Sequence, residues 1–223
     1  QLEQEGWEVT TILPDQNGDI SAESVLAAVR PDTALVSVMM VNNELGSIYP
    51  IADIAKGLKA VNEKTLLHTD AVQGFLKVPF SAKALGADFI AISGHKVGAP
   101  KGIGALYIGP RVRNPRPLLP GGGQEMGLRS GTEATAQIAG FAKAVELRWD
   151  HLEDKLRHMA EVKAYAVEKL TAIPDLQIIG DGKAPHVLSV SMAGWPSQNV
   201  VNDLGSQGIC VSAGSACHHG KSS

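Results

Sequence analysis

A lysine follows closely on a short, largely apolar run near the middle of the chain. The run from Ala87 to Ile92 is typical of a strand buried on both faces of a parallel sheet, and it ends abruptly at Ser93, Gly94, His95 and Lys96. Open α/β sheets bind their ligands at the carboxyl ends of the strands. A lysine beside an apolar core loses hydration, becomes a better amine nucleophile and can form a Schiff base with a carbonyl. Lys96 is therefore the candidate for covalent attachment of an aldehyde cofactor, with a surface lysine in a turn as the alternative.

Polar side chains also follow the two preceding apolar runs. Asn42 comes just after the run that ends at Met40, and Asp70 and Gln73 follow the run over residues 65–68. Because the carboxyl ends of parallel strands meet at one edge of a sheet, we expect these residues to converge with Lys96. If the cofactor carries a pyridine ring, as pyridoxal phosphate does, a carboxylate at Asp70 could keep the ring nitrogen protonated.

The other polar residues could hold the remaining groups of the same cofactor. Asn42 and Gln73 could hydrogen-bond its phenolic oxygen, while Ser93, His95 and Thr132 could hold its phosphate. Each of these residues alone is a weak signal, since Asp, Asn, Ser and Thr after strands commonly form turns and caps.

The two cysteines lie in different surroundings. Cys217 belongs to a run of small residues over 212–220, which predicts an exposed, mobile loop where a protonated histidine nearby would favour the reactive thiolate. Cys210 is flanked by two apolar residues and is expected to be a buried, inert thiol. His218 and His219 beside Cys217 raise a metal-binding alternative. Adjacent histidines cannot easily converge on one ion, so we expect no metal site.

The elements that must position these groups alternate between strands and helices over residues 1–110. This alternation predicts βαβ units and hence an α/β fold with a mostly parallel sheet flanked by helices. Ser21 is expected to cap one of the helices. Strands are expected at 7–13, 34–40, 65–68, 87–92 and 105–108, and helices at 21–30, 51–62 and 81–85.

The second half of the chain predicts a linking region and part of a smaller α+β domain. A proline-rich connection over 111–120 leads to three glycines, and Arg129 to Thr132 are expected to cap a long helical region that ends near Leu170 as two helices or one bent helix. The predicted domains are a large cofactor-binding domain over 1–148 and a small domain over 149–223. Further elements are expected at 175–179, 187–191 and 209–211 as strands and at 198–207 as a helix.

Composition excludes several classes of partner. A net charge of −3 without any basic run makes nucleic acid an unexpected partner. No apolar run reaches the roughly 18 residues of a membrane span, and the start lacks the pattern of a signal peptide. Two thiols argue against a disulfide scaffold. We therefore expect a cytoplasmic protein without membrane contact, and a chain cut at both ends, because it opens without Met.

Seven motifs occur in order along the chain: VNNELG at 41–46, HTDAVQ at 68–73, SGHK at 93–96, PKGIGALY at 100–107, GGGQE at 121–125, RSGT at 129–132 and SAGSAC at 212–217. Together they resemble the motifs of the pyridoxal-phosphate-dependent cysteine desulfurases, which belong to the class V aminotransferase group on the fold-type I scaffold. The last motif resembles the branch of this family in which the catalytic cysteine lies on a long flexible loop.

The resemblance implies a homodimeric enzyme that converts L-cysteine to L-alanine. Its cysteine would attack the sulfur of the bound substrate and pass the resulting persulfide to a sulfur-acceptor protein, as in iron–sulfur cluster assembly or tRNA thiolation. The implied catalytic residues are Lys96, which forms the Schiff base, Asp70 at the pyridine nitrogen, His95 and Cys217. The implied cofactor contacts add Asn42 and Gln73 at the ring oxygen, Ser93 with His95 at the phosphate, and Thr132 at the phosphate of the partner subunit.

Three features leave alternatives open. The family's amino-terminal phosphate-binding turn and its substrate-binding arginine fall outside this sequence, so an inactive fragment acting as a dimerisation or scaffold module is one alternative. A class V aminotransferase or a selenocysteine lyase on the same scaffold is another, and a transaminase has no need of the Cys217 loop. The residues after Cys217, His218 to Lys221, differ from the Thr- and Ser-rich continuation common in the family, which leaves the sulfur acceptor open.

Overall fold

The computed structural model describes residues 2–180 and 182–214, and these form two compact units. The first unit consists of the chain up to Leu13, Ile20–Met40 and Tyr49–Leu152. The second consists of Pro14–Asp19, Val41–Ile48 and the chain from Glu153 onward. The predicted domain boundary after residue 148 stays a prediction.

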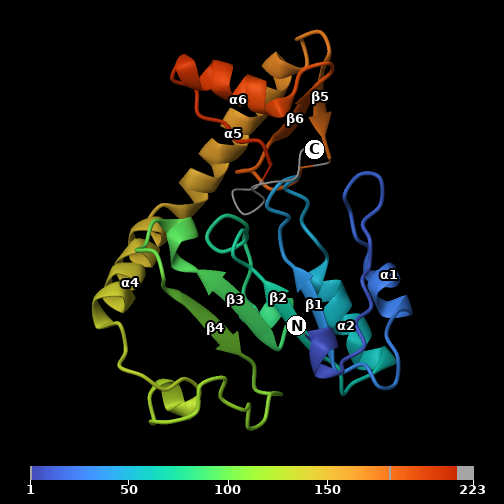
Figure 1. Cartoon of the computed structure of the whole chain (residues 1–223), viewed down its shortest axis with the longest axis vertical. Coiled ribbons are helices and arrows are strands. Elements are labelled where there is room, and N and C mark those ends of the chain that lie inside the picture. Colours follow the sequence, from blue (N-terminus) through green and yellow to red (C-terminus); the bar gives the residue numbers. More distant parts are fainter. Residues whose placement is uncertain (1, 181, 215–223) are drawn as a thin grey trace. The chain divides into compact units, whose positions relative to one another are not determined.

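A four-stranded sheet forms the centre of the first unit (Figure 1). Its order is β1 (Leu35–Met39), β2 (Leu66–Asp70), β3 (Phe89–Ser93) and β4 (Gly104–Ile108). The first three strands are parallel, and β4 runs antiparallel to β3. Met39 lies opposite Asp70, and Asp70 lies opposite Ala91, so the carboxyl ends of three strands share one edge. The predicted α/β fold with a mostly parallel sheet is confirmed.

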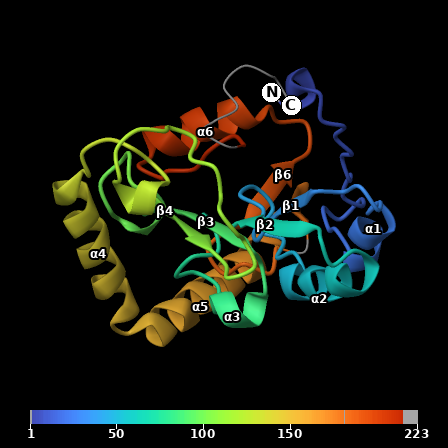
Figure 2. The same ribbon diagram turned by 90° about the horizontal axis from the view of Figure 1, so that it is seen from below.

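Three helices of the first unit contact one another in sequence order. They are α1 (Ala22–Ala27), α2 (Ile51–Val61) and α3 (Ala82–Leu85), and Figure 2 shows them together on one side of the sheet. Ser21 caps α1 by accepting a hydrogen bond from the Ser24 amide at 3.1 Å, as predicted. The buried face of α2 and the facing strand residues form the core, which includes Ile51, Ile54, Leu58, Leu67 and Ile90.

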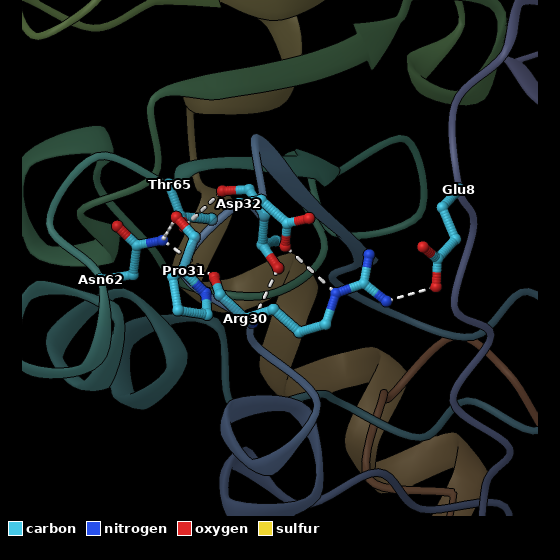
Figure 3. Close-up of polar contacts among 7 residues, drawn as sticks. Glu8, Arg30, Pro31, Asp32, Asn62 and Thr65 are labelled. Carbon is cyan, nitrogen blue, oxygen red and sulfur yellow. Dashed lines mark hydrogen bonds and ion pairs between the residues drawn. The ribbon is translucent and has the colours of Figure 1, made fainter.

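The loops that enter β1 and β2 are tied together by side chains (Figure 3). The Thr65 hydroxyl donates to the Thr33 carbonyl at 2.8 Å, and the Asn62 amide donates to the Arg30 carbonyl at 3.0 Å. The guanidinium of Arg30 pairs with Asp32 at 3.1 Å and also with Glu8. Because the two loops are fixed to each other, the register of the two strands is fixed where they begin.

A buried carboxylate closes the same end of the sheet. Asp88 is 2% exposed, accepts the Leu67 amide at 2.8 Å and pairs with Arg111 at 3.5 Å. Arg111 also donates to the Glu63 carbonyl at 2.6 Å, which links the exit of β4 to the entrance of β2. A cavity of about 470 Å³ lies beside this guanidinium, at the opposite end of the strands from Lys96; its lining residues are Glu63, Lys64, Leu66, Pro110, Arg111 and Arg113.

Helix α4 (Thr135–Trp149) packs against the turn that follows β3. The rings of Phe75 and Phe141 meet edge to face with centroids 6.5 Å apart. A Cβ atom at Gly140 would lie 3.0 Å from Pro100, so the helix and the turn approach closely there. The helix begins after Ala134 without a side-chain cap, so the prediction that residues 129–132 cap it is wrong. One short 3₁₀ turn, η3 (Glu125–Gly127), lies in the connection between β4 and α4.

The second unit combines helices with a two-stranded antiparallel sheet. Its elements are α5 (Leu152–Leu170), β5 (Leu176–Ile179), β6 (Ser189–Met192) and α6 (Ser197–Ser206). The predicted break between the two long helices falls at His151, which has a φ of 61°. Lys163 of α5 donates to the carbonyls of Gly182 and, at 2.7 Å, Ala184.

Two predicted strands and one predicted burial are wrong. Residues 7–13 form no strand, and Trp7 and Leu13 are 56% and 80% exposed. Residues 209–211 form no strand either, and Cys210 is exposed rather than buried. Apolar residues at strand spacing need a neighbouring backbone to pair with, and neither segment finds one in the described part of the chain. The chain instead begins with a 3₁₀ turn, η1 (Leu2–Glu5). Among the described helices, none combines the length and apolarity required to cross a bilayer.

Candidate active site

The turn that carries Lys96 is held by a glycine that cannot be replaced without a clash. β3 ends at Ser93, and the 3₁₀ turn η2 (Gly94–Val97) follows at once. The Gly94 amide donates to the Ile103 carbonyl at 2.9 Å, and a Cβ atom at residue 94 would lie 2.8 Å from the Ile103 side chain. Gly94 is buried while the neighbouring Lys96 is exposed. The turn therefore presents the lysine outward on a fixed backbone.

Helix α4 supports this turn from a second side. The Arg148 side chain donates from Nε to the Val97 carbonyl at 2.9 Å. The Ala99 amide donates back to the Gly94 carbonyl at 3.0 Å. The carbonyls of Gly94 and Val97, which flank Lys96 in the sequence, are therefore both hydrogen-bonded.

Ser93 and His95 lie together at the end of β3. The Ser93 hydroxyl and Nδ1 of His95 are 2.7 Å apart and share a hydrogen bond. His95 is exposed and Ser93 is half-buried. A hydroxyl and an imidazole at one point can both donate to an oxyanion, which is what the predicted phosphate contact requires.

Asp70 ends β2, the strand next to β3, and its carboxylate is exposed. One oxygen, Oδ1, accepts the Val72 amide at 2.9 Å, which closes a tight turn. Asp70 therefore stabilises a turn, as aspartates after strands commonly do. It also lies at the same edge of the sheet as Lys96. Among the described residues, neither a hydrogen bond nor an ion pair joins the Asp70 carboxylate to the Lys96 amine.

Gln73 follows Asp70 in the same turn and contacts a buried lysine that sequence reasoning missed. Lys77 Nζ donates to Gln73 Oε1 at 3.1 Å, and Lys77 is only 8% exposed. Burial, followed by the positive charges of Lys96 and Arg148, lowers the pKa of the Lys77 amine to about 8. The segment between them is a turn and not a helix, so their spacing of four residues is no signal for this contact.

The other predicted site residues have different placements. Asn42 belongs to the second unit, where its Oδ1 accepts the amides of Glu44 at 2.9 Å and Leu45 at 2.8 Å and so shapes its own turn. Thr132 is exposed in the segment that precedes α4. Cys217 lies outside the described residues.

The groups that the first unit brings to this edge fit pyridoxal phosphate. An exposed amine can take its aldehyde, a carboxylate suits its ring nitrogen, and a hydroxyl–imidazole pair suits its phosphate. The positive charges of Lys96 and Arg148 act on Lys77, so three cations of the first unit lie near one another and favour an anionic ligand. The proposed contacts of Lys96, Asp70, Ser93 and His95 with this group are consistent with that charge.

Three comparisons place the chain among known proteins. Residues 1–221 match the family model described as aminotransferase class-V. A cysteine desulfurase of Nostoc sp. is 39% identical over 223 residues, which cover 99% of this chain and 55% of that protein. A solved NifS-like protein superposes with a TM-score of 0.89 at 38% identity, over 95% of this chain and 58% of that one. SspA, solved in complex with cysteine, superposes with a TM-score of 0.77 at 35% identity, over 97% of this chain and 59% of that one.

Proposed function

Because the chain belongs to the aminotransferase class-V family, we propose that the protein containing it is a pyridoxal-phosphate-dependent cysteine desulfurase. It would convert L-cysteine to L-alanine and hold the sulfur as a persulfide on Cys217. The chain spans about half the length of the relatives it matches, so this activity is proposed for the whole protein. The observation that carries the proposal is the exposed Lys96 amine, held by Gly94 and Arg148 at the strand edge that also carries Asp70.

Each site residue has a defined task in this proposal. The bound cofactor supplies an electron sink. Lys96 would hold it covalently through its aldehyde and, when released, move protons at the substrate. Asp70 would keep a proton on the ring nitrogen, and Ser93 with His95 would hold the phosphate.

Three further tasks fall to residues outside this group. Gln73 and Asn42 would contact the ring oxygen, and Thr132 would reach the phosphate of a partner subunit in a homodimer. The Cys217 thiolate would accept sulfur and pass it to an acceptor protein of iron–sulfur cluster assembly or tRNA thiolation. A cytoplasmic location is part of the same proposal.

The experiment that tests the proposal uses the full-length protein with pyridoxal phosphate. We expect a visible absorption band that is lost in Lys96→Ala. With an added dithiol to reduce the persulfide, we also expect release of alanine and sulfide from L-cysteine that is lost in Cys217→Ala. Lys83→Ala, which removes an exposed lysine of α3, is the matched control and should keep both.

Two outcomes would count against the proposal in different ways. A class V aminotransferase would keep its activity in Cys217→Ala, because transamination needs no thiol. A protein that forms no band with the cofactor would be an inactive fold used only for dimerisation or as a scaffold.

A further inference from the structure

The turn after β2 brings the side chains of Gln73 and Lys77 together. The Ala71 carbonyl accepts the amide of Phe75 at 2.8 Å, and the Gly74 carbonyl accepts the amide of Val78 at 2.9 Å. Within this turn Lys77 Nζ donates a hydrogen bond to Gln73 Oε1 at 3.1 Å.

This turn is packed against the end of β1 and has little freedom to move. Met40, which is 2% exposed, lies so close to Gly74 that a Cβ atom there would be 2.3 Å from the methionine sulfur. Leu76 is 5% exposed and has a φ of 56°. The backbone on either side of Gln73 and Lys77 is therefore fixed by the core.

The chemistry of the two side chains decides which way the Gln73 amide points. A lysine ammonium has three donors and no acceptor, so the atom of Gln73 that faces it must be the oxygen. The amide nitrogen of Gln73 is bonded to the same carbon and is consequently turned away from Lys77. Without Lys77, the amide could rotate by half a turn and present its oxygen instead.

The burial of Lys77 reduces the stability of the fold. Lys77 is 8% exposed, and its burial together with the like charges of Lys96 and Arg148 lowers the pKa of its amine. A buried cation with one neutral partner destabilises the fold relative to an apolar side chain of similar size. Residues that reduce stability in this way are frequent at functional sites.

We propose that Lys77 is a positioning residue that fixes the Gln73 amide so that its nitrogen donates into the site. The inference rests on the proposed function, which gives this donor an acceptor in the ring oxygen of pyridoxal phosphate. Lys77 acts only through Gln73 and touches neither cofactor nor substrate.

The test is a double-mutant cycle on cofactor binding by the full-length protein. The variants are Lys77→Met, Gln73→Leu and the double variant, with Lys83→Met as a charge-matched control on the exposed face of α3. The readouts are the apparent Kd for pyridoxal phosphate, the wavelength of the absorption maximum of the bound cofactor, and the melting temperature of the apoprotein. Since methionine removes a buried charge, Lys77→Met should not melt below wild type.

We expect Lys77→Met to weaken binding about tenfold and to shift the absorption maximum. Gln73→Leu should do the same, and the double variant should be no weaker than Gln73→Leu alone. Effects that multiply in the double variant, or a Lys77→Met protein that binds and absorbs as wild type does, would overturn the inference.

A second variant tests the direction of the amide without altering Lys77. Gln73→Glu keeps an oxygen for Lys77 but has no donor on the other side, so it should bind as weakly as Gln73→Leu. Wild-type affinity in Gln73→Glu would refute the role of the amide nitrogen. Failure of the proposed function itself would appear separately, as a wild-type protein with no absorption band sensitive to Lys96→Ala.

Discussion

His68 and Asp70 are neighbours on one face of β2, and the environment of the histidine makes the protein sensitive to acid. His68 Nδ1 and the Ser37 hydroxyl share a hydrogen bond of 2.8 Å. Burial lowers the pKa of His68, while the negative charge of Asp70 raises it and only partly compensates. The folded state therefore binds fewer protons at His68 than the unfolded state does.

The difference in protons bound at His68 determines how the stability of the protein changes with pH. The contribution of neutral His68 to stability is complete above the pKa of about 6.5 that it has in the unfolded state. This contribution is lost as the pH falls through the lower pKa that it has in the folded state. We expect the free energy of unfolding to fall as the pH is lowered from 7 to 5, and His68→Asn to reduce that slope. Urea unfolding at several pH values measures it.

A second variant checks the assigned cause. Asp70→Asn removes the charge that raises the pKa of His68, so the slope should become steeper. An unchanged slope in both variants would mean that other groups dominate the acid sensitivity.

Residue chemistry in the sequence identified most of the groups at the sheet edge, but it could not assign their contacts. Asp70 could be either a turn residue or a cofactor ligand by its place in the sequence, and the structure shows its Oδ1 bonded to the Val72 amide in the turn. Lys77 gives no signal in the sequence because lysine side chains are usually exposed, whereas this one is 8% exposed.

At the scale of single elements, Gly94 is the residue on which the position of Lys96 depends. An alanine there would place its Cβ 2.8 Å from Ile103 and 3.0 Å from Ala99, so one of them must move. We expect Gly94→Ala to lower the free energy of unfolding by about 1–3 kcal/mol, as overpacking does. It should also reduce the absorption band formed with pyridoxal phosphate. Urea unfolding and absorption titration measure the two effects.

Gly98 offers a matched control in the same turn. A Cβ atom at Gly98 meets no atom within 4 Å, and only its φ of 86° opposes a side chain. Gly98→Ala should therefore cost about 1–2 kcal/mol of backbone strain without crowding Ile103. If both variants bind the cofactor equally well, the clash at Gly94 is not what positions Lys96.

Elements with their own local signals could be predicted from the sequence. The serine cap and apolar spacing identified α1 and α2, and β1 and β3 followed from short apolar runs. The antiparallel direction of β4 was also accessible, because the connection after Lys96 is too short for the crossover that a parallel strand needs. Residues 7–13 carry a similar pattern yet form no strand, because strand formation depends on a partner that local sequence cannot supply.

At the scale of the whole molecule, the sequence predicted two regions but could not assign the short inserted segments. Pro14–Asp19 and Val41–Ile48 cluster with the carboxyl-terminal unit although their neighbours in sequence belong to the first. The reason is side-chain contact within that unit, since a Cβ atom at Gly46 would lie 3.0 Å from Val187, and the Ala184 amide donates to the Gly46 carbonyl at 2.9 Å. Such long-range contacts leave no periodic signal in sequence.

The return of β4 beside β3 makes the lysine turn the tip of a hairpin whose two arms lie within the sheet. Ser93 pairs with Gly104, and the hydrogen bond from the Gly94 amide to the Ile103 carbonyl continues the ladder into the turn itself. Solvent deuterium should therefore enter β3 over residues 89–93, which has a paired strand on each side, only when the first unit opens as a whole. Residues 111–123, which lack helix and strand, should exchange within seconds. Mass spectrometry of deuterated peptides would detect this contrast, and rapid uptake over 89–93 would contradict it. The backbone that carries Lys96 would then become mobile only when the first unit unfolds as a whole. Warming would therefore free it only near the melting temperature.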